Sequence, residues 1–354
     1  MDKITVKDIA RELGLSVGTV YRSLNNTGRV SAKTKSIVLE QARKMGFQPN
    51  TIAQGLAKRK KFHIVVLLPN DVPTWWDSVK SGVEKAERSL SEFGTEVTIM
   101  QYSFLSSTNS PIGILDFIKN NEIDGIIMVP SIHREVLKTL DYAKSKNIPV
   151  ACVNADVQSA QRLFYYGPDE EQVGTMAGDL IGSFIKKNGN ICLLGVESND
   201  FYRLALRKAG AFNQLCKYYP NINITNTYAF PLENLEKHIE EMLAEHADDI
   251  SGIYVYDSLA LETTAKVLKK NRIKHIAVVG HECLDECSRY IDEGYITATL
   301  CQETISQGYH PLKLLYSYLL SHVEIQPYYY SNVNIVTRGN LKNLLINENG
   351  CGFK

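Results

Sequence analysis

Four residues near the start of the chain have side chains and a spacing that suit contact with DNA bases. Arg22 can donate two parallel hydrogen bonds to guanine, and Val17 can touch the methyl group of thymine. Tyr21 can reach a base edge or a phosphate, whereas Gly18 offers no side chain, so readout of its base should be poor. Residues three and four apart are neighbours on a helix, so these four would share one face. They are our candidates for direct base readout.

Two short helices must hold these residues in place. Thr5 and Asp8 can form a capping box, which predicts a first helix from Val6 to Leu13. Ser16 is a suitable N-cap for a second helix from Val17 to Leu24. The pair predicts a helix-turn-helix, whose second helix lies in the major groove. A core shared by the two helices is predicted from Ile9, Ala10, Leu13, Leu15, Val20 and Leu24.

A third helix from Ala32 to Lys44, capped by Ser31, completes the predicted domain, and Ile37, Val38 and Ala42 should close its core. This third helix and the basic run at 58–61 weaken the alternative, which is a helical hairpin without a partner. Polar residues near the second helix are expected to hold phosphates and to set the register on DNA without conveying sequence. They are Thr5, Ser16, Thr19, Asn25, Arg29, Ser31 and Thr34.

The stretch TVKDIARELGLSVGTVYRSLNNTGRVSAKTKSIVLEQARKMGFQPNTIAQGLA resembles the N-terminal domain and hinge of the LacI/GalR family of bacterial transcription regulators, without a gap. The resemblance implies that the segment from Asn50 to Ala57 is a hinge that becomes helical on DNA. It also implies that Leu56 is an apolar wedge that enters the minor groove and kinks the duplex. The minor-groove candidates are Asn50, Ala53, Gln54, Leu56 and Ala57.

Charge is distributed unevenly along the 354 residues. Residues 1–61 hold 13 Lys and Arg against 4 Asp and Glu, a net +9, while the remaining 26 against 35 give −9. A basic head on an acidic body is typical of polyanion binding confined to one end.

No apolar run reaches the roughly 18 residues of a membrane span, and MDKITVKD lacks the apolar region of a signal peptide. We therefore expect a cytoplasmic protein, which the seven scattered cysteines fit as free thiols.

From Phe62 onward, short apolar runs alternate with helical patterns, as expected for parallel strands buried on both faces. The predicted fold class is multidomain: an all-α helix-turn-helix DNA-binding domain, then an α/β core of two doubly wound parallel-sheet subdomains. This core is similar to the sugar-binding core of the same family, itself related to periplasmic sugar-binding proteins. The predicted domains are 1–49 for the helix-turn-helix, 50–61 for the hinge and basic linker, 62–340 for the core and 341–354 for the tail. Within the core, the N-subdomain is placed at about 62–160 and 292–324, and the C-subdomain at about 161–291 and 325–340.

Two such sheets are expected to bind a ligand in a cleft at the carboxyl ends of their strands. Trp75 and Trp76 are placed in the loop after the first strand, where an indole can stack on a sugar or base, although one of them could be core. Arg207 begins RKAG and matches the arginine-x-x-glycine of the family's ligand-binding arginine, and Arg203, one turn earlier, could replace it. The remaining effector candidates follow strand ends and are Asp156, Asp257, Glu282 and Gln302.

One position departs from the family pattern. The family usually has an aspartate two residues after the glycine of the VVG strand, where this chain has His281 and Glu282. Glu282 is the nearest equivalent but reaches further, which implies a different effector or a reshaped pocket.

His281, Cys283 and Cys287 lack a fourth ligand for zinc, so we interpret the cysteines as small hydrophobic residues. No dinucleotide, P-loop, G-x-S-x-G or H-E-x-x-H motif occurs, so we expect no cofactor and no catalytic centre.

These patterns together predict a homodimeric repressor that binds a near-palindromic operator in double-stranded DNA and is switched by a carbohydrate-like small-molecule effector. A sugar-binding transport protein would suit the core alone, and a regulator whose core binds a protein partner is the other alternative. The tail NLKNLLINENGCGFK is too short and too broken for a coiled coil, so we expect a dimer and not a tetramer.

Overall fold

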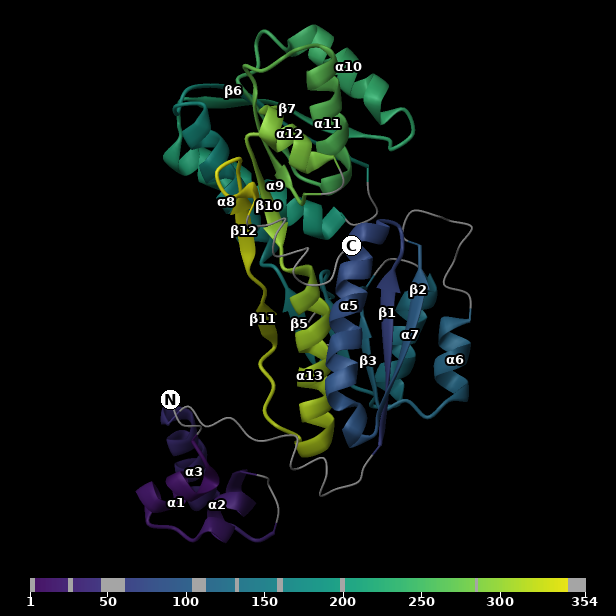
Figure 1. The fold of residues 1–354 in the computed structure, drawn as a ribbon, viewed down its shortest axis with the longest axis vertical. Coiled ribbons are helices and arrows are strands. Elements are labelled where there is room, and N and C mark those ends of the chain that lie inside the picture. The colour runs from purple at the N-terminus through teal and green to yellow at the C-terminus, as the bar shows by residue number, and fades with distance from the viewer. Residues whose placement is uncertain are drawn as a thin grey trace.

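A computed structural model of the protein describes residues 4–24, 28–45, 61–103, 113–130, 134–157, 162–197, 201–283 and 286–342. Three helices form the N-terminal domain, which lies at one end of the molecule (Figure 1). They are α1 (Val6–Leu13), α2 (Val17–Leu24) and α3 (Ala32–Lys44), with the bounds predicted from the caps and the apolar spacing. Their core contains Ile9, Ala10, Val20, Val38 and Ala42. Ile37 does not contribute as predicted, because its side chain is 44% exposed.

The first α/β unit contains a parallel sheet of six strands in the order β11-β5-β4-β3-β1-β2. Most of its elements lie between residues 62 and 167, and two arrive from the end of the chain. They are β1 (Phe62–Pro69), α5 (Pro73–Leu90), the 3₁₀ turn η1 (Ser91–Phe93), β2 (Thr95–Tyr102), α6 (Ile114–Asn120), β3 (Gly125–Met128), α7 (Arg134–Ser145), β4 (Val150–Val153), β5 (Phe164–Gly167), α13 (Thr304–Ser321) and β11 (Tyr328–Tyr330).

The second α/β unit has a six-stranded sheet in the order β12-β10-β9-β8-β6-β7, in which β12 pairs antiparallel with β10 and the other pairs are parallel. Its elements are α8 (Glu170–Phe184), β6 (Gly189–Val196), α9 (Phe201–Tyr218), β7 (Ile222–Phe230), α10 (Leu235–His246), β8 (Gly252–Val255), α11 (Ser258–Lys270), β9 (Ala277–His281), α12 (Cys287–Glu293), β10 (Ala298–Gln302) and β12 (Val333–Val336).

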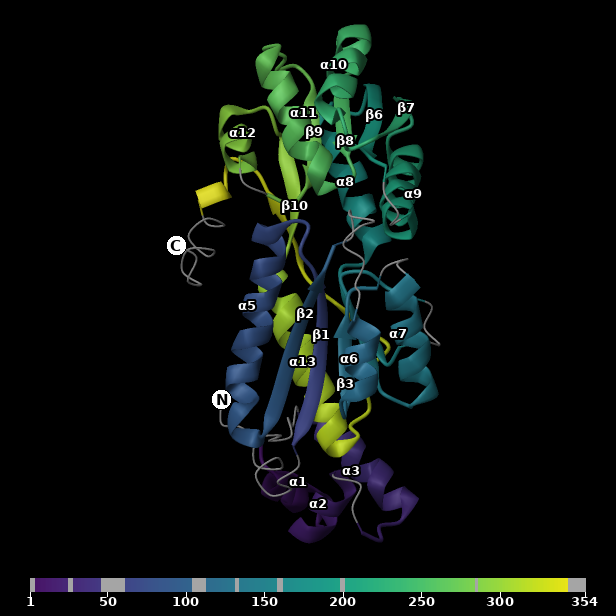
Figure 2. The ribbon, with the colours of Figure 1, turned by 90° about the vertical axis from the view of Figure 1, so that its right-hand side faces the viewer.

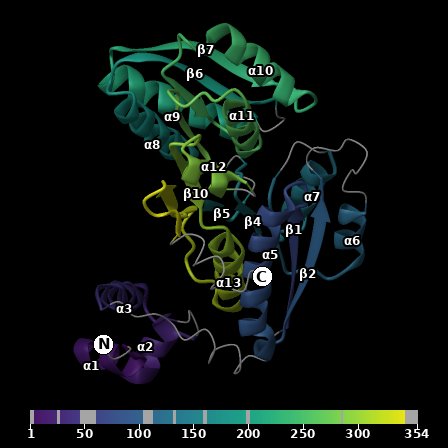
Figure 3. The same ribbon diagram turned by 45° about the horizontal axis from the view of Figure 1, so that its top comes forward.

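Each sheet is covered by helices on both faces, which is the doubly wound arrangement that the sequence predicted (Figure 2). In the first unit, Ile64 and Val66 pack with α5 and α13, while Val65 and Leu67 pack with α6 and α7. In the second unit, α10, α11 and α12 cover one face of the sheet, and α8 and α9 cover the other (Figure 3). Strands buried on both faces explain the nearly continuous apolar runs, because neither face is exposed to water.

The predicted subdomain boundaries are wrong at three strands. β5 was assigned to the second unit but pairs with β4 in the first, where Ala151 lies opposite Phe164. β10 was assigned to the first unit but pairs with β9 in the second. β11 was assigned to the second unit but pairs with β5 in the first. The chain therefore passes between the units after β5, after β10 and after β11. The prediction failed because the sheet to which a strand belongs depends on the strand it pairs with, and that strand can be far away in the sequence.

Three further elements differ from the prediction. Helix α5 begins at Pro73, so Trp75 and Trp76 lie in its first turn and not in the loop where the sequence analysis placed them. The earlier start has a local cause, because proline is favoured at the first position of a helix. Helix α12 and strand β11 were not predicted, since both are short and have no clear periodicity.

Candidate functional site

The candidate base-reading residues lie together on the exposed face of α2. Val17 and Tyr21 are each 46% exposed, and Gly18 and Arg22 are exposed as well. The aliphatic stem of Arg22 lies against Gly28, where an added Cβ would approach Arg22 Cδ to 2.9 Å. The outward orientation of this face is confirmed. Its contact with bases stays a prediction.

Hydroxyl groups near α2 also serve as helix caps. The N–H of Thr19 donates to Ser16 Oγ at 3.1 Å, and the N–H of Thr34 donates to Ser31 Oγ at the same distance. Asp8 accepts hydrogen bonds from the N–H and the hydroxyl of Thr5, at 2.9 and 2.6 Å. These caps confirm the predicted helix starts, while their phosphate contacts and that of the exposed Arg29 stay predictions. Asn25 and the hinge residues Asn50, Ala53, Gln54, Leu56 and Ala57 lie outside the described residues.

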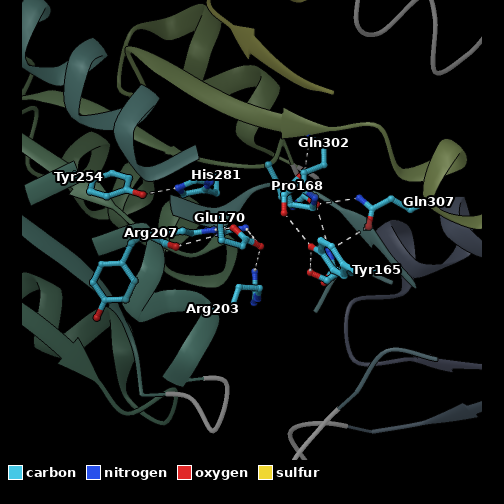
Figure 4. Close-up of polar contacts among 12 residues, drawn as sticks. Tyr165, Pro168, Glu170, Arg203, Arg207, Tyr254, His281, Gln302 and Gln307 are labelled. Carbon is cyan, nitrogen blue, oxygen red and sulfur yellow. Dashed lines mark hydrogen bonds and ion pairs between the residues drawn. The ribbon is translucent and has the colours of Figure 1, made fainter. Parts of the chain in front are cut away.

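A second group of polar side chains lies where the two α/β units meet, and we call this region the junction. It is defined by Asn154, Glu170, Glu282, Gln302 and Gln307, which lie at or just after strand ends or in the first turns of helices of the two units. Figure 4 shows Gln302 of the second unit directed toward Gln307 of the first. Asn154 Nδ2 and Gln307 Nε2 both donate to Gln302 Oε1, at 3.2 and 2.9 Å. Hydrogen bonds therefore connect the units through the predicted effector residue Gln302.

Glu282 extends this network within the second unit. Its side chain accepts a hydrogen bond from Gln302 Nε2 at 2.7 Å and another from the Gln302 N–H at 3.3 Å. Its backbone has φ = 64°, a left-handed conformation that costs a residue other than glycine about 1–3 kcal/mol. Burial raises the pKa of Glu282, while Arg207, the hydrogen bonds from Gln302 and the Trp75 indole act in the opposite direction. The predicted replacement for the family aspartate thus lies at the junction.

Arg207 lies at the junction in a buried ion pair that the sequence did not predict. Its Nε and Nη2 donate to the two carboxylate oxygens of Glu170, and Nη1 donates to the carbonyl oxygen of Tyr256 at 3.2 Å. Arg207 is 2% exposed and Glu170 is 6% exposed. Arg203, the alternative to Arg207, lies 3.8 Å from the same carboxylate (Figure 4).

His281 and Tyr254 form a buried pair beside Arg207. The Tyr254 hydroxyl and His281 Nε2 share a hydrogen bond of 2.8 Å (Figure 4). Burial holds the pKa of His281 well below its ordinary value, and the positive charges of Arg207 and Arg203 lower it further. The imidazole is therefore neutral at pH 7 and adds no positive charge to the junction.

Two predicted effector residues have carboxylates that already bond within one unit. Asp257 caps α11 by accepting the Ala260 N–H at 2.9 Å, and it also accepts the Val196 N–H at 2.6 Å. Asp156 accepts hydrogen bonds from Nε and Nη2 of Arg162, whose guanidinium also lies 4.6 Å from the ring centre of Tyr328. An effector contact stays a prediction for both residues.

Trp75 and Trp76 are both core residues of the first unit, at 9% and 6% exposure. Their rings meet edge to face, with centroids 4.4 Å apart. The Trp75 indole N–H has no hydrogen-bond partner of normal geometry among the described residues, yet it lies close enough to Glu282 to lower that pKa. Trp75 therefore faces the junction from the first unit.

Three junction residues were missed by sequence reasoning. Asn154 directly follows β4, so the strand-end rule that selected Asp156 could have found it. Glu170 begins α8, where an acidic residue is usually explained by the positive end of the helix. Gln307 lies inside α13 and had no sequence signal, although it is only 1% exposed.

Other kinds of site find little support in the described part of the chain. No three His, Cys, Asp or Glu side chains gather there to hold a metal ion. None of the described helices is both long and apolar enough to cross a membrane. A surface pocket between α10 and α11, lined by Leu232, Glu236 and Lys266 among others, contains none of the predicted effector residues.

Comparison with protein families gives two matches along the chain. Residues 64–321 match the periplasmic binding protein domain, which covers both α/β units except for β11 and β12. Residues 5–50 match the bacterial regulatory proteins of the lacI family, which covers the three N-terminal helices. The two matches agree with the division into a DNA-binding domain and an α/β core.

Similar proteins fall into regulators and sugar-binding proteins. The HTH-type transcriptional regulator DegA of Bacillus subtilis is 29% identical over 44% of this chain and 44% of its own length. Catabolite control protein A of Priestia megaterium is 27% identical over 51% of this chain and 52% of its own length. The chain thus matches about half the length of these relatives.

Two solved structures share the fold of the core. A putative LacI transcriptional regulator from Bacteroides fragilis has a TM-score of 0.70 and 18% identity, over 80% of this chain and 99% of that one. GanP, a glucose-galactose binding protein from Geobacillus stearothermophilus, has a TM-score of 0.69 and 20% identity, over 80% and 99%.

Proposed function

We propose that this chain, which belongs to the LacI family of bacterial regulatory proteins and carries a periplasmic binding protein domain, is a sequence-specific transcription regulator that represses its genes. The observation that carries the proposal is the exposed face of α2, where Val17, Tyr21 and Arg22 project from a capped helix. This helix belongs to a segment with a net charge of +9, which supplies the sequence-independent attraction to phosphates. The protein acts in the cytoplasm on double-stranded DNA, and its function requires no catalysis.

Replacing Arg22 with alanine tests the base-reading face. On the best sequence selected from random DNA, Arg22→Ala should weaken binding by about 1–3 kcal/mol, because a bidentate contact to guanine is lost. Binding to unrelated DNA should change little. Fluorescence anisotropy at fixed salt measures both affinities.

Arg29→Ala is the matched control, since Arg29 is also exposed in this domain but is assigned to the phosphate backbone. It should weaken binding to both DNAs by a similar factor and make the affinity less dependent on salt. Equal losses on both DNAs in the Arg22 variant would place Arg22 in the phosphate class as well, and would contradict direct readout.

The regulator should work as a homodimer on a near-palindromic operator. A two-fold symmetric operator requires two DNA-binding domains. A symmetric interface, in which the same patch of each core contacts the other, brings two of them together in a closed dimer. Light scattering coupled to size exclusion at micromolar concentration should therefore give the mass of two chains. A mass of four chains would refute the interpretation of the tail, and a mass of one chain would contradict the two-fold mechanism.

The junction is the proposed site of the effector, a small carbohydrate-like molecule. Gln302 of the second unit accepts hydrogen bonds from Asn154 and Gln307 of the first, so a molecule bound there would alter contacts between the units. An effector that prefers one arrangement of the units shifts the separation of the two hinges in the dimer. It can change the DNA affinity only by the ratio of its own affinities for the two states.

A further inference from the structure

Carboxyl groups outnumber guanidinium groups at and beside the junction. Glu170, Asp257 and Glu282 are each no more than 6% exposed. The basic side chains that act on these carboxylates are Arg203 and Arg207. Because His281 is neutral, three carboxylates face two guanidinium groups.

The buried arginine already uses three of its five N–H donors. Each of the three guanidinium nitrogens of Arg207 donates a hydrogen bond, two of them to Glu170 and one to the Tyr256 carbonyl oxygen. A bidentate grip on a phosphate or carboxylate uses two adjacent N–H groups of this fork. An anionic ligand could grip the edge formed by Nε and Nη2 only by displacing Glu170, which would leave a second buried carboxylate without its cation.

Glu282 is the buried carboxylate that lacks an ion pair. Its side chain accepts hydrogen bonds from the side chain and the N–H of Gln302, and no Lys or Arg of the described chain lies within ion-pair distance of it. Burying a charge in this way is unfavourable unless a partner compensates it. The left-handed backbone at Glu282 adds strain at the same residue. Strain and an uncompensated charge together indicate a functional role.

The Trp75 indole acts on the same carboxylate from the first unit. Its indole N–H is buried, has no hydrogen-bond partner of normal geometry in the described chain, and acts on Glu282 from the other unit. Glu282 is an acceptor, and the remaining lone pairs of its carboxylate can each receive a further hydrogen bond. A molecule that both donates and accepts hydrogen bonds, such as a polyol, would satisfy the two groups at once.

We propose that the effector is a hydroxyl-rich molecule without negative charge, and that Glu282 is the residue that excludes its phosphorylated and acidic derivatives. The inference rests on the proposed function, since it names the chemical class of the effector at that junction. Hydroxyl groups donate to the carboxylate of Glu282, whereas an anion meets like charge there and finds the Nε and Nη2 edge of Arg207 occupied by Glu170.

Isothermal titration of the full-length protein with matched sugars tests the class. The probes are D-glucose with D-glucose 6-phosphate and D-glucuronate, D-galactose with its 6-phosphate and D-galacturonate, and D-ribose with D-ribose 5-phosphate. In every set that binds, the uncharged sugar should bind about 100-fold more tightly than its anionic partners, because like charges in an interface repel strongly.

The outcomes separate this inference from the proposed function. Tight binding of anionic members alone, with a change in DNA affinity, would overturn the inference while the small-molecule switch stands. If no probe of either class binds, the proposed carbohydrate effector itself fails, and the inference fails with it.

Variants of Glu282 test the residue assignment. Glu282→Gln keeps the shape and one of the two hydrogen bonds from Gln302 but removes the charge, so the preference for the uncharged sugar should fall about tenfold. Glu282→Asp keeps the charge and should keep the preference. Glu245→Gln, exposed on α10, removes one carboxylate away from the junction and should leave the ratio unchanged. An unchanged ratio in Glu282→Gln would overturn the role of Glu282.

Discussion

Replacing Glu170 with leucine should lower the free energy of unfolding by about 3–5 kcal/mol, because the guanidinium of Arg207 would stay buried without its partner. The pair is closed to solvent on both sides, with Arg207 at 2% and Glu170 at 6% exposure. Arg207→Met should cause a loss of similar size by leaving the carboxylate unpaired. Urea unfolding of the full-length protein, followed by circular dichroism, measures both.

The double variant Glu170→Leu/Arg207→Met distinguishes two quantities. One is the net contribution of the ion pair to stability, and the other is the destabilisation caused by leaving one buried charge without its partner. A buried ion pair replaced by apolar side chains of similar volume is often neutral or stabilising, so the double variant should recover most of the loss. Glu236→Leu is the matched control, because Glu236 forms an ion pair of 2.6 Å with Lys266 on the surface. That control should change stability little, since water screens an exposed pair. If the double variant is as unstable as the less stable single variant, the losses do not come from breaking the ion pair between Glu170 and Arg207.

Replacing Gly308 with alanine should destabilise the first unit by about 3 kcal/mol or more, because an added methyl group has no space between α5 and α13. A Cβ at Gly308 would overlap the carbonyl oxygen of Val79, and one at Gly82 would overlap that of Ile305. The two helices touch through their backbones, so neither side can yield by a simple rotamer change. The same unfolding measurement detects the loss.

Gly18→Ala is the control for this substitution. An added Cβ at Gly18 in α2 would have its nearest neighbours at 4.0 Å, so the methyl group fits. Alanine should then stabilise the helix by up to about 1 kcal/mol, through its better helix propensity. A loss at Gly308 no larger than the change at Gly18 would show that α5 and α13 can separate. In that case their crossing would not fix Trp75 and Gln307 at the junction.

The sequence by itself determined the elements of the N-terminal domain and the class of the core. The three helices have the predicted bounds because their signals are local: Ser16 and Ser31 accept backbone hydrogen bonds three residues ahead. The doubly wound class followed from apolar runs that only strands buried on both faces require. The exposed face of α2 could also be predicted from the sequence, because helical spacing alone places Val20 in the core and Tyr21 on the surface.

Only the tertiary structure decided which strands share a sheet and which partner each charged side chain has. The strand β5 pairs with β4 and β11, and no pattern within its own residues distinguishes that position from the start of a second unit. The bonds of Arg207 to Glu170 and of Gln302 to Asn154 join residues 37 and 148 positions apart. Such contacts depend on how helices and strands pack against one another. The neighbouring residues in the sequence determine the face of the helix or strand on which a side chain lies, but they do not determine which residue it contacts across the junction.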